Sequence, residues 1–350
     1  MTDLRHHGDV DARPGLLDFA VNVRGGGPPD WLRDVLVDAV GGVGRYPSPA
    51  EDLAARDAVA RRHGRAAEEV LVLAGAAEGF ALLPGLRSRL AAVVHPSFTE
   101  PEVALRQAGI PVRRIMLSAD DGYRLGPVPE DADLVVIGNP TNPTSVLHDR
   151  ADLLGLVRPG RVVVVDEAFM DAVPGEPESL AGEANPGILV VRSLTKTWAL
   201  PGLRAGYALG SPEVLARLAR NRPHWPVGTL QLAAVEACSG PAATAEAARV
   251  ANEIVRNRES LVGELVGIPG IEVHEPASGP FLLLTVKDGE RVREGLRRRG
   301  IAVRRGDTFP GLTADHLRVA VRDPESCAAL VRALRAELGS DHGNLKAGLV

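Results

Sequence analysis

A lysine follows an apolar run in the stretch "SLTKTWALPGLRAGY", which extends from Ser193 to Tyr207. Hydroxyl side chains flank this lysine, Lys196, and Arg204 follows it in the same loop. A lysine at the end of a buried strand loses hydration, which lowers its pKa and leaves a near-neutral amine that can form a Schiff base. Ser193 and Arg204 can both bind a phosphate group. This set of side chains suits pyridoxal 5′-phosphate, an aldehyde that carries a phosphate.

This hypothesis requires a buried carboxylate, because the pyridine nitrogen of the cofactor must stay protonated if the ring is to accept electrons. Asp166 ends the run "VVVVD", at the carboxyl edge where α/β sheets bind ligands. An aspartate at such a position is also a common helix N-cap, so both roles are open. The turn "GNPTNPT" follows another apolar run, and we expect Asn142 to reach the cofactor ring rather than only to shape a turn.

Two further stretches have residue types that suit the same cofactor. "LAGAAEGF" places Ala76 and Ala77 where a strand enters a helix, so that free N–H groups at the helix start can bind phosphate. Phe98, in "HPSFTEP", follows a strand and offers a ring that can lie on the face of the cofactor. A turn and a core phenylalanine are the simpler interpretations of these two stretches.

A sheet must position these residues. Short β-branched runs alternate with helical patterns, and several of the runs are apolar on both faces, as in a parallel sheet that is covered on both sides. This alternation predicts an α/β layer architecture. From Ala242 a long helical stretch leads into a second, smaller set of strands and helices. We therefore expect an N-terminal arm that joins the small domain (1–44), a large cofactor-binding domain (45–240), a small domain (241–339) and a disordered tail (340–350).

Composition narrows the class of protein. The 350 residues carry a net charge of −5, which disfavours a nucleic-acid partner. Two cysteines support neither a disulfide framework nor a zinc site, and we expect no metal. The charged N-terminus lacks the apolar core of a signal peptide, and no apolar run reaches the ~18 residues that a membrane span needs. These features predict a cytoplasmic protein with a small-molecule substrate and no membrane partner.

The motifs S-L-T-K-x-x-x-x-P-G-L-R-x-G-Y, V-D-E-A-F and N-P-T-N-P-T resemble those of the fold-type I pyridoxal-phosphate enzymes, in the class I/II aminotransferase family. The resemblance covers nearly the whole chain and implies an α/β fold, with a large mainly parallel-sheet domain and a smaller α+β domain. It also implies the roles of the cofactor site: Lys196 as the covalent link, Asp166 at the pyridine nitrogen, Asn142 at the ring oxygen O3′, Ser193, Arg204, Ala76 and Ala77 at the phosphate, and Phe98 on the ring face.

The substrate side resembles the branch of the family that holds histidinol-phosphate aminotransferase and the threonine-phosphate decarboxylase of cobalamin synthesis. "RYPSP" resembles a motif whose tyrosine, here Tyr46, reaches the cofactor phosphate of a neighbouring subunit, which implies a homodimer. "RHHGD" and "LDFAVNVRGGGPP" resemble segments that bring His6 and Asn22 near a substrate phosphate. "GIAVRRGDTFPGL" and "LRVAVRDPES" imply that Arg304 binds the substrate phosphate and Arg318 its carboxylate.

One residue favours a particular reaction. Many aminotransferases of this group have a tyrosine where this chain has Phe169, whereas the decarboxylases lack it. We therefore expect decarboxylation of L-threonine O-3-phosphate to aminopropanol phosphate in cobalamin biosynthesis. Departures such as Arg24 and "HHGD" in place of "HGGN" leave the substrate open. The alternatives are a histidinol-phosphate-type aminotransferase and, more remotely, a non-catalytic pyridoxal-phosphate-binding regulator; no G-x-G-x-x-G motif supports a nicotinamide-binding protein.

Overall fold

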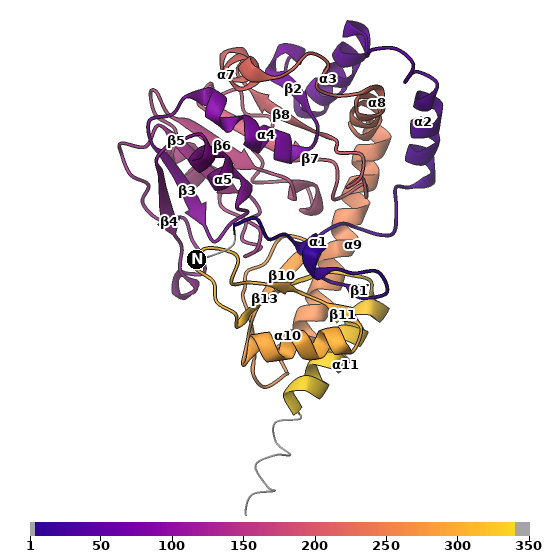
Figure 1. Ribbon diagram of the computed structural model, residues 1–350, viewed down its shortest axis with the longest axis vertical. Helices are drawn as coiled ribbons and strands as arrows, with labels where there is room; N and C mark the ends of the chain where they lie inside the picture. Colours follow the sequence, from indigo (N-terminus) through magenta and orange to yellow (C-terminus); the bar gives the residue numbers. More distant parts are fainter. Residues whose placement is uncertain (1–3, 340–350) are drawn as a thin grey trace, which may run out of the picture.

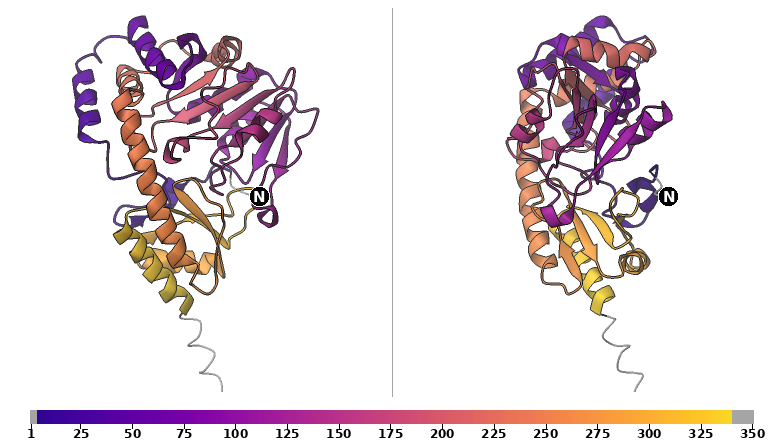
Figure 2. Two further views of the ribbon diagram at one scale, coloured as in Figure 1. Left: turned by 180° about the vertical axis from the view of Figure 1, so that it is seen from behind. Right: turned by 90° about the vertical axis from the view of Figure 1, so that its left-hand side faces the viewer.

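The computed structural model of the chain describes residues 4–339, and the predicted disordered tail, 340–350, lies outside them. A large sheet and a small sheet are linked by the long helix α9 (Pro241–Leu265), which extends along both of them (Figures 1 and 2). The start of α9 packs into the core around the large sheet through Ala243 and Ala247, and its end packs into the core of the small sheet through Leu261 and Leu265.

The large sheet has seven strands in the order β2-β8-β7-β6-β5-β3-β4. Strands β3 to β7 are parallel to one another, whereas β8 is antiparallel to β7 and β2 is antiparallel to β8. The predicted α/β fold with a mainly parallel sheet is therefore confirmed. The strands are β2 (Val70–Leu73), β3 (Ala91–His95), β4 (Val112–Met116), β5 (Leu134–Gly138), β6 (Val162–Asp166), β7 (Ile188–Ser193) and β8 (Gly206–Gly210).

Both faces of this sheet are buried, which explains its continuous apolar runs. Along β6, Val163 and Val165 belong to the core on one face, and Val162 and Val164 to the core on the other. Helices α4, α5 and α7 contribute to the second core, and helices α2, α3, α6 and α8 to the first. These helices are α2 (Asp30–Val40), α3 (Pro49–His63), α4 (Ala76–Leu82), α5 (Glu100–Gln107), α6 (Arg150–Gly155), α7 (Pro212–Leu218) and α8 (Thr229–Cys238).

Helix α3 shows how local sequence sets an element's bounds. The Ser48 side chain accepts a hydrogen bond from the backbone N–H of Glu51, whose carboxylate accepts one from the Ser48 N–H in return. This capping box satisfies two donors that the first turn would otherwise leave free. The helix ends at His63, and the capping residue Gly64 has a φ of +66°, the left-handed conformation that glycine permits.

The small sheet is antiparallel, in the order β12-β13-β10-β9, and the N-terminal segment completes this part of the molecule. Residues Leu17–Asp18 (β1) pair in parallel with Ile301–Ala302 (β11), and Phe19 lies in the core under the small sheet. The remaining elements are α1 (Gly8–Asp11), β9 (Ile271–Val273), β10 (Phe281–Val286), α10 (Gly289–Arg298), β12 (Arg304–Arg305), β13 (His316–Ala320) and α11 (Pro324–Gly339).

The sheet register brings several of the predicted residues to one edge. Gly138 at the end of β5 lies opposite Asp166 at the end of β6, and Asp166 in turn lies opposite Val191 of β7. Because these strands are parallel, the loops that carry Asn142 and Lys196 leave the sheet at the same edge, which faces the small sheet (Figure 1). Within residues 4–339, no helix is long and apolar enough to cross a membrane.

Candidate active site

A cavity of about 560 Å³ lies at this edge and is lined by residues of the large sheet, the small sheet and the N-terminal segment. Lys196 lines it from the loop between β7 and β8. Burial and the nearby cations Arg318 and Arg204 lower the pKa of Lys196 to about 8. A substantial fraction of this amine is therefore neutral near physiological pH, which is the form that reacts with an aldehyde.

Asp166 lines the same cavity from the end of β6. Its Oδ1 accepts a hydrogen bond from the backbone N–H of Ala168 (3.0 Å), so the carboxylate also shapes the turn that follows the strand. Burial raises the pKa of Asp166 to about 6, although the Ala168 hydrogen bond and the Lys196 charge act in the opposite direction. A buried carboxylate of this kind gains a partner when a protonated nitrogen is placed beside it.

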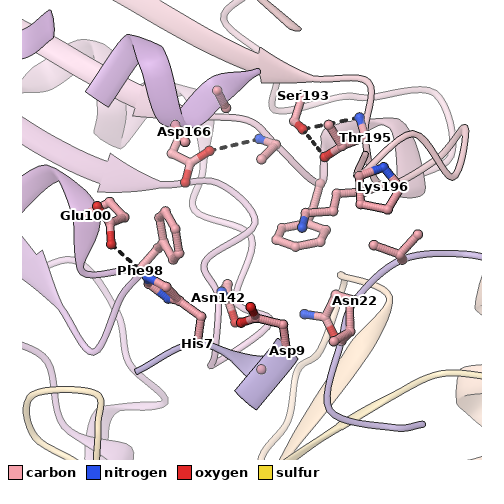
Figure 3. A pocket seen from close by; sticks show the side chains of 18 of the residues that line it. His7, Asp9, Asn22, Phe98, Glu100, Asn142, Asp166, Ser193, Thr195 and Lys196 are labelled. Carbon is pink, nitrogen blue, oxygen red and sulfur yellow. Dashed lines mark hydrogen bonds and ion pairs between the residues drawn. The ribbon is translucent and has the colours of Figure 1, made fainter. Parts of the chain in front are cut away.

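The phosphate-binding features predicted from sequence lie together. Ala76 and Ala77 start helix α4 beside the cavity. Ser193 lines it from the last position of β7, and Arg204 from the loop that precedes β8. Gly75 has a φ of +79°, and a Cβ added to it would lie 3.0 Å from Nη2 of Arg204. The guanidinium therefore packs directly on this glycine, next to the first N–H groups of the helix. Ser193 Oγ is 2.7 Å from Oγ1 of Thr195, another hydroxyl in the cavity (Figure 3).

This donor set fits pyridoxal 5′-phosphate. A short helix start, two hydroxyls and an arginine can hold a phosphate, while Lys196 and Asp166 are available to an aldehyde and a ring nitrogen. Phe98 borders the cavity with its ring 5.9 Å from that of Phe80 and 5.4 Å from that of His7. Residues from separate loops of the large sheet thus meet in one site of suitable chemistry.

Arg318 lies at the small-sheet side of the cavity, on β13. It donates to Oδ1 of Asn142 (2.7 Å) and to the Ala20 carbonyl, while its Nε has no partner. Burial and the neighbouring Arg304 lower the pKa of Arg318 to about 9, so the guanidinium stays charged at neutral pH. A buried cation with an unused donor is suited to an anionic group of a ligand.

Asn22 is a second buried residue with polar atoms that have no hydrogen-bond partner in the described structure. Its side chain is 8% exposed, lines the cavity, and neither the amide nitrogen nor the amide oxygen has a hydrogen bond in the described structure. Buried amides are almost always hydrogen-bonded, and an unpaired one is destabilising. Because Asn22 lines the cavity, a ligand that packs against this amide can supply the missing partners.

Three residues that were predicted to bind the substrate or to reach a neighbouring subunit contact other residues of their own chain. Arg304 lines the cavity, but it donates to the His6 carbonyl (2.6 Å), to Thr308 (2.7 Å) and to the Asp11 carboxylate (3.3 Å). The His6 ring does not border the cavity and contacts Asp11 at 3.1 Å. Tyr46 is 70% exposed and stacks on the Trp225 ring at 4.2 Å, away from the cavity of its own chain.

Sequence reasoning missed other residues that line the cavity. His7, rather than His6, faces it, and Nε2 of His7 is 2.6 Å from a carboxylate oxygen of Glu100 (Figure 3). Asp9 also points into the cavity from α1. The only available signal was the cluster of ionisable side chains in "RHHGD", because a segment this short has no periodicity from which to read the side that each residue faces.

Comparison with known proteins gives the family. Residues 14–334 match the family described as aminotransferase class I and II. The chain belongs to this family. A histidinol-phosphate aminotransferase of Mycobacterium tuberculosis (strain H37Rv) is 56% identical to it over 91% of this chain and 87% of that protein. A threonine-phosphate decarboxylase of Salmonella typhimurium is 31% identical, over 91% and 90% of the two chains. The solved histidinol-phosphate aminotransferase of Clostridium acetobutylicum superposes with a TM-score of 0.84 at 22% identity, over 93% and 100% of the two chains.

Family membership establishes that this aminotransferase-family chain is a pyridoxal-phosphate-dependent enzyme with fold type I, as the motifs predicted. The expected reaction, however, was wrong. The relatives at 56% identity are named histidinol-phosphate aminotransferases, whereas a threonine-phosphate decarboxylase shares only 31% of its residues with this chain. The expectation relied on the missing hydroxyl at Phe169, whose ring packs edge-to-face on Phe281 at 4.9 Å. That single side chain is a weaker indicator of the reaction than the similarity of the whole sequence.

Proposed function

We propose that this enzyme is a histidinol-phosphate aminotransferase, which moves an amino group from histidinol phosphate to 2-oxoglutarate and forms glutamate. The main support is the 56% identity, over 91% of this chain, to proteins that carry this name. The cavity adds physical support, because it combines an amine of lowered pKa with a buried arginine that can bind an anion. Both proposed amino donors, histidinol phosphate and glutamate, have an anionic group close to the amino carbon.

The cofactor, when bound, withdraws electrons from the bonds of the amino carbon, so that its C–H bond can be broken. Lys196 would take the proton from that carbon onto its Nζ and would not return it to the same carbon, which becomes the carbonyl carbon of the product; a pKa of about 8 suits proton transfer near neutral pH. Arg318 binds the phosphate of histidinol phosphate or the carboxylate of glutamate, and Asn142 orients its guanidinium through their 2.7 Å hydrogen bond. Asp166 keeps the ring nitrogen protonated.

The remaining cofactor contacts follow from the same arrangement. We assign the phosphate to Ala76, Ala77, Ser193 and Arg204, the ring oxygen to Asn142 and the ring face to Phe98. The Asn142 oxygen is used by Arg318, but its amide nitrogen has no hydrogen bond within residues 4–339 and is free to donate. Arg304 acts here mainly by anchoring the N-terminal segment, because its donors are already directed at His6, Asp11 and Thr308.

We also infer a homodimer in which Tyr46 reaches the cofactor phosphate of the second subunit. Tyr46 and Trp225 form a stacked pair of exposed rings, 70% and 57% accessible, which is unusual for large aromatic side chains on a free surface. The two cysteines, Cys238 and Cys327, are buried and unpaired, which supports a reducing, cytoplasmic setting. The chain divides, in this proposal, into an arm (1–44), a large domain (45–240) and a small domain (241–339).

One experiment tests the reaction. The purified, cofactor-loaded enzyme is incubated with histidinol phosphate and 2-oxoglutarate, and glutamate is measured; a parallel sample receives L-threonine O-3-phosphate, and CO₂ is measured. Glutamate without CO₂ supports the proposal, whereas CO₂ release without glutamate refutes it. Lys196→Ala is the control, because it should abolish both the glutamate signal and the visible absorbance of the bound cofactor.

Mixed dimers test the role of Tyr46. Lys196→Ala subunits are expected to form inactive homodimers, and Tyr46→Ala subunits weakly active ones. A hybrid has one site with an intact lysine and an intact tyrosine from the other chain, so mixing should restore activity to about one site per hybrid. If mixing restores no activity although hybrids form, Tyr46 does not act across the interface.

A further inference from the structure

Asp9 is a carboxylate in a cavity that otherwise receives anions. It lies on α1, lines the cavity and has no hydrogen bond or ion pair with any residue in the described part of the chain. Asp9 and Lys196 line the same cavity. Asp9 is also exposed to solvent. Its carboxylate repels a phosphate or a second carboxylate, so it favours a ligand group that is cationic or donates a hydrogen bond.

The segments that carry Asp9 and Asn22 touch each other beside the cavity. Gly8, directly before Asp9, packs so closely on the second segment that a Cβ there would lie 2.4 Å from the Ala20 carbonyl oxygen. Figure 3 shows the Asp9 and Asn22 side chains both pointing into the cavity. Asn22 is 8% exposed, and both polar atoms of its amide are without partners. A carboxylate and an unsatisfied amide therefore face the same part of the cavity.

The segment that carries Asp9 is held in place from both sides. Oγ1 of Thr99 donates to the Leu4 carbonyl (2.6 Å), and His7 contacts Glu100 at 2.6 Å, so helix α5 and the residue before it bind the segment to the large sheet. Arg304 binds the His6 carbonyl (2.6 Å) from the small sheet. Asp11, two residues after Asp9, also accepts a hydrogen bond from Arg304 (3.3 Å). Asp9 thus lies between anchored residues, although its own side chain makes no contact of this kind.

An imidazole ring complements this pair of side chains. A neutral imidazole has one N–H donor and one nitrogen acceptor, which match a carboxylate and an amide NH₂ group; a protonated one has two donors, which match the carboxylate and the amide oxygen. We propose that Asp9 and Asn22 together bind the imidazole ring of histidinol phosphate and so determine the substrate preference of the enzyme. This inference rests on the proposed function and assigns the part of the substrate that Arg318 does not bind.

Asp9 and Asn22 would also distinguish the two amino donors, histidinol phosphate and glutamate. Glutamate places a carboxylate where histidinol phosphate has its ring, so Asp9 favours one and disfavours the other. Removing the Asp9 charge therefore has opposite effects on the two substrates. General damage to the site would instead weaken both, which makes the direction of the change informative.

Asp9→Asn is the test, because it keeps the shape and removes the charge of an unpaired side chain. We expect the KM for histidinol phosphate to rise about 10- to 100-fold, the scale of a lost hydrogen bond to a charged group, with kcat nearly unchanged. The KM for glutamate should stay the same or fall. Alaninol phosphate, which has a methyl group in place of the imidazolylmethyl group, should bind both forms equally by calorimetry. Asp120→Asn, which removes an exposed carboxylate outside this cavity, is the matched control.

Asn22→Ala provides a second measurement and should weaken histidinol phosphate far more than alaninol phosphate. The inference is overturned if Asp9→Asn weakens both phosphates by the same factor, or neither, while the unaltered enzyme transaminates histidinol phosphate. If the unaltered enzyme forms no glutamate from histidinol phosphate, the proposed function is overturned and this inference with it.

Discussion

The buried ion network behind the active site allows a quantitative prediction about Arg192. This residue lies at the end of β7, is 1% exposed, and donates to Glu167 (2.8 Å), Asp171 (2.8 Å) and Glu176 (2.5 Å). Arg62 also contacts Asp171 and Glu176, at 2.7 and 3.1 Å, but Glu167 has Arg192 as its one cationic partner in residues 4–339. We predict that Arg192→Met destabilises the fold substantially.

The magnitude follows from the partner that loses its cation. Glu167 is 1% exposed and keeps hydrogen bonds from the Ser179 hydroxyl (2.8 Å) and the Leu180 N–H (2.7 Å), but these do not neutralise its charge. Removing one partner of a buried pair costs about 3–5 kcal/mol. Burial already raises the pKa of Glu167 while Arg192 lowers it, so in the variant that pKa rises further. The deficit should therefore grow with rising pH and shrink towards pH ~4, where carboxyl groups protonate.

Urea unfolding of the cofactor-loaded protein, followed by circular dichroism at several pH values, measures this change in the free energy of unfolding. Arg113→Met is the matched control, because Arg113 pairs with Asp131 at 3.3 Å on the surface, where such pairs contribute about 0–1 kcal/mol. A loss below about 1 kcal/mol for Arg192→Met at pH 7, or one no larger than the control's, would refute the reasoning.

Three further predictions concern the cofactor site. The pKa of about 8 for Lys196 predicts that apoprotein condenses with pyridoxal 5′-phosphate at a rate whose pH midpoint is near 8. Arg318→Gln should move this midpoint upwards, because it removes a charge that repels the protonated amine. A midpoint near 10 in the unaltered protein would contradict this. Asp166→Asn should lower kcat by at least about 100-fold in the glutamate assay, which is the scale for loss of a preorganised charge. An unchanged kcat would exclude the proposed role of Asp166 at the ring nitrogen. Gly75→Ala should weaken cofactor binding about tenfold in equilibrium dialysis. The φ of Gly75 is +79°, and the new Cβ would lie 3.0 Å from Nη2 of Arg204. Equal affinity would show that this close packing is dispensable.

Local sequence predicts the position of a site residue best where that residue directly follows a strand in one continuous motif. Lys196 and Asp166 each leave a buried strand of the large sheet, so their place at its carboxyl edge could be deduced without knowing the tertiary structure. The parallel pairing of β5, β6 and β7 follows from their apolar faces. The reversed direction of β8 could not be deduced, because a strand buried on both faces has the same pattern in either direction.

Contacts between distant segments account for most of what sequence did not reveal. Arg304 is held by Asp11 and by the His6 carbonyl from the opposite end of the chain, so its availability to a ligand depends on a contact that no local motif encodes. The same holds for Arg192, whose sequence context "LVVRS" suggests only the end of a strand, while its carboxylate partners lie in a separate loop. His7 and His6 differ by one position, which is enough to turn one ring towards the cavity and the other away from it.

The pairing of β1 with β11 has a consequence for synthesis on the ribosome. Residues Leu17–Asp18 are made before their partners, Ile301–Ala302, which lie 284 residues further along the chain (301 − 17). At roughly 5–20 residues per second, the first strand waits ~15 to 60 s for its partner. During that time Phe19, which is fully buried in the finished protein, has no core to enter. The large sheet can form on the nascent chain once β8 has been made, whereas the small sheet, and with it the closed cavity, must await the synthesis of β13.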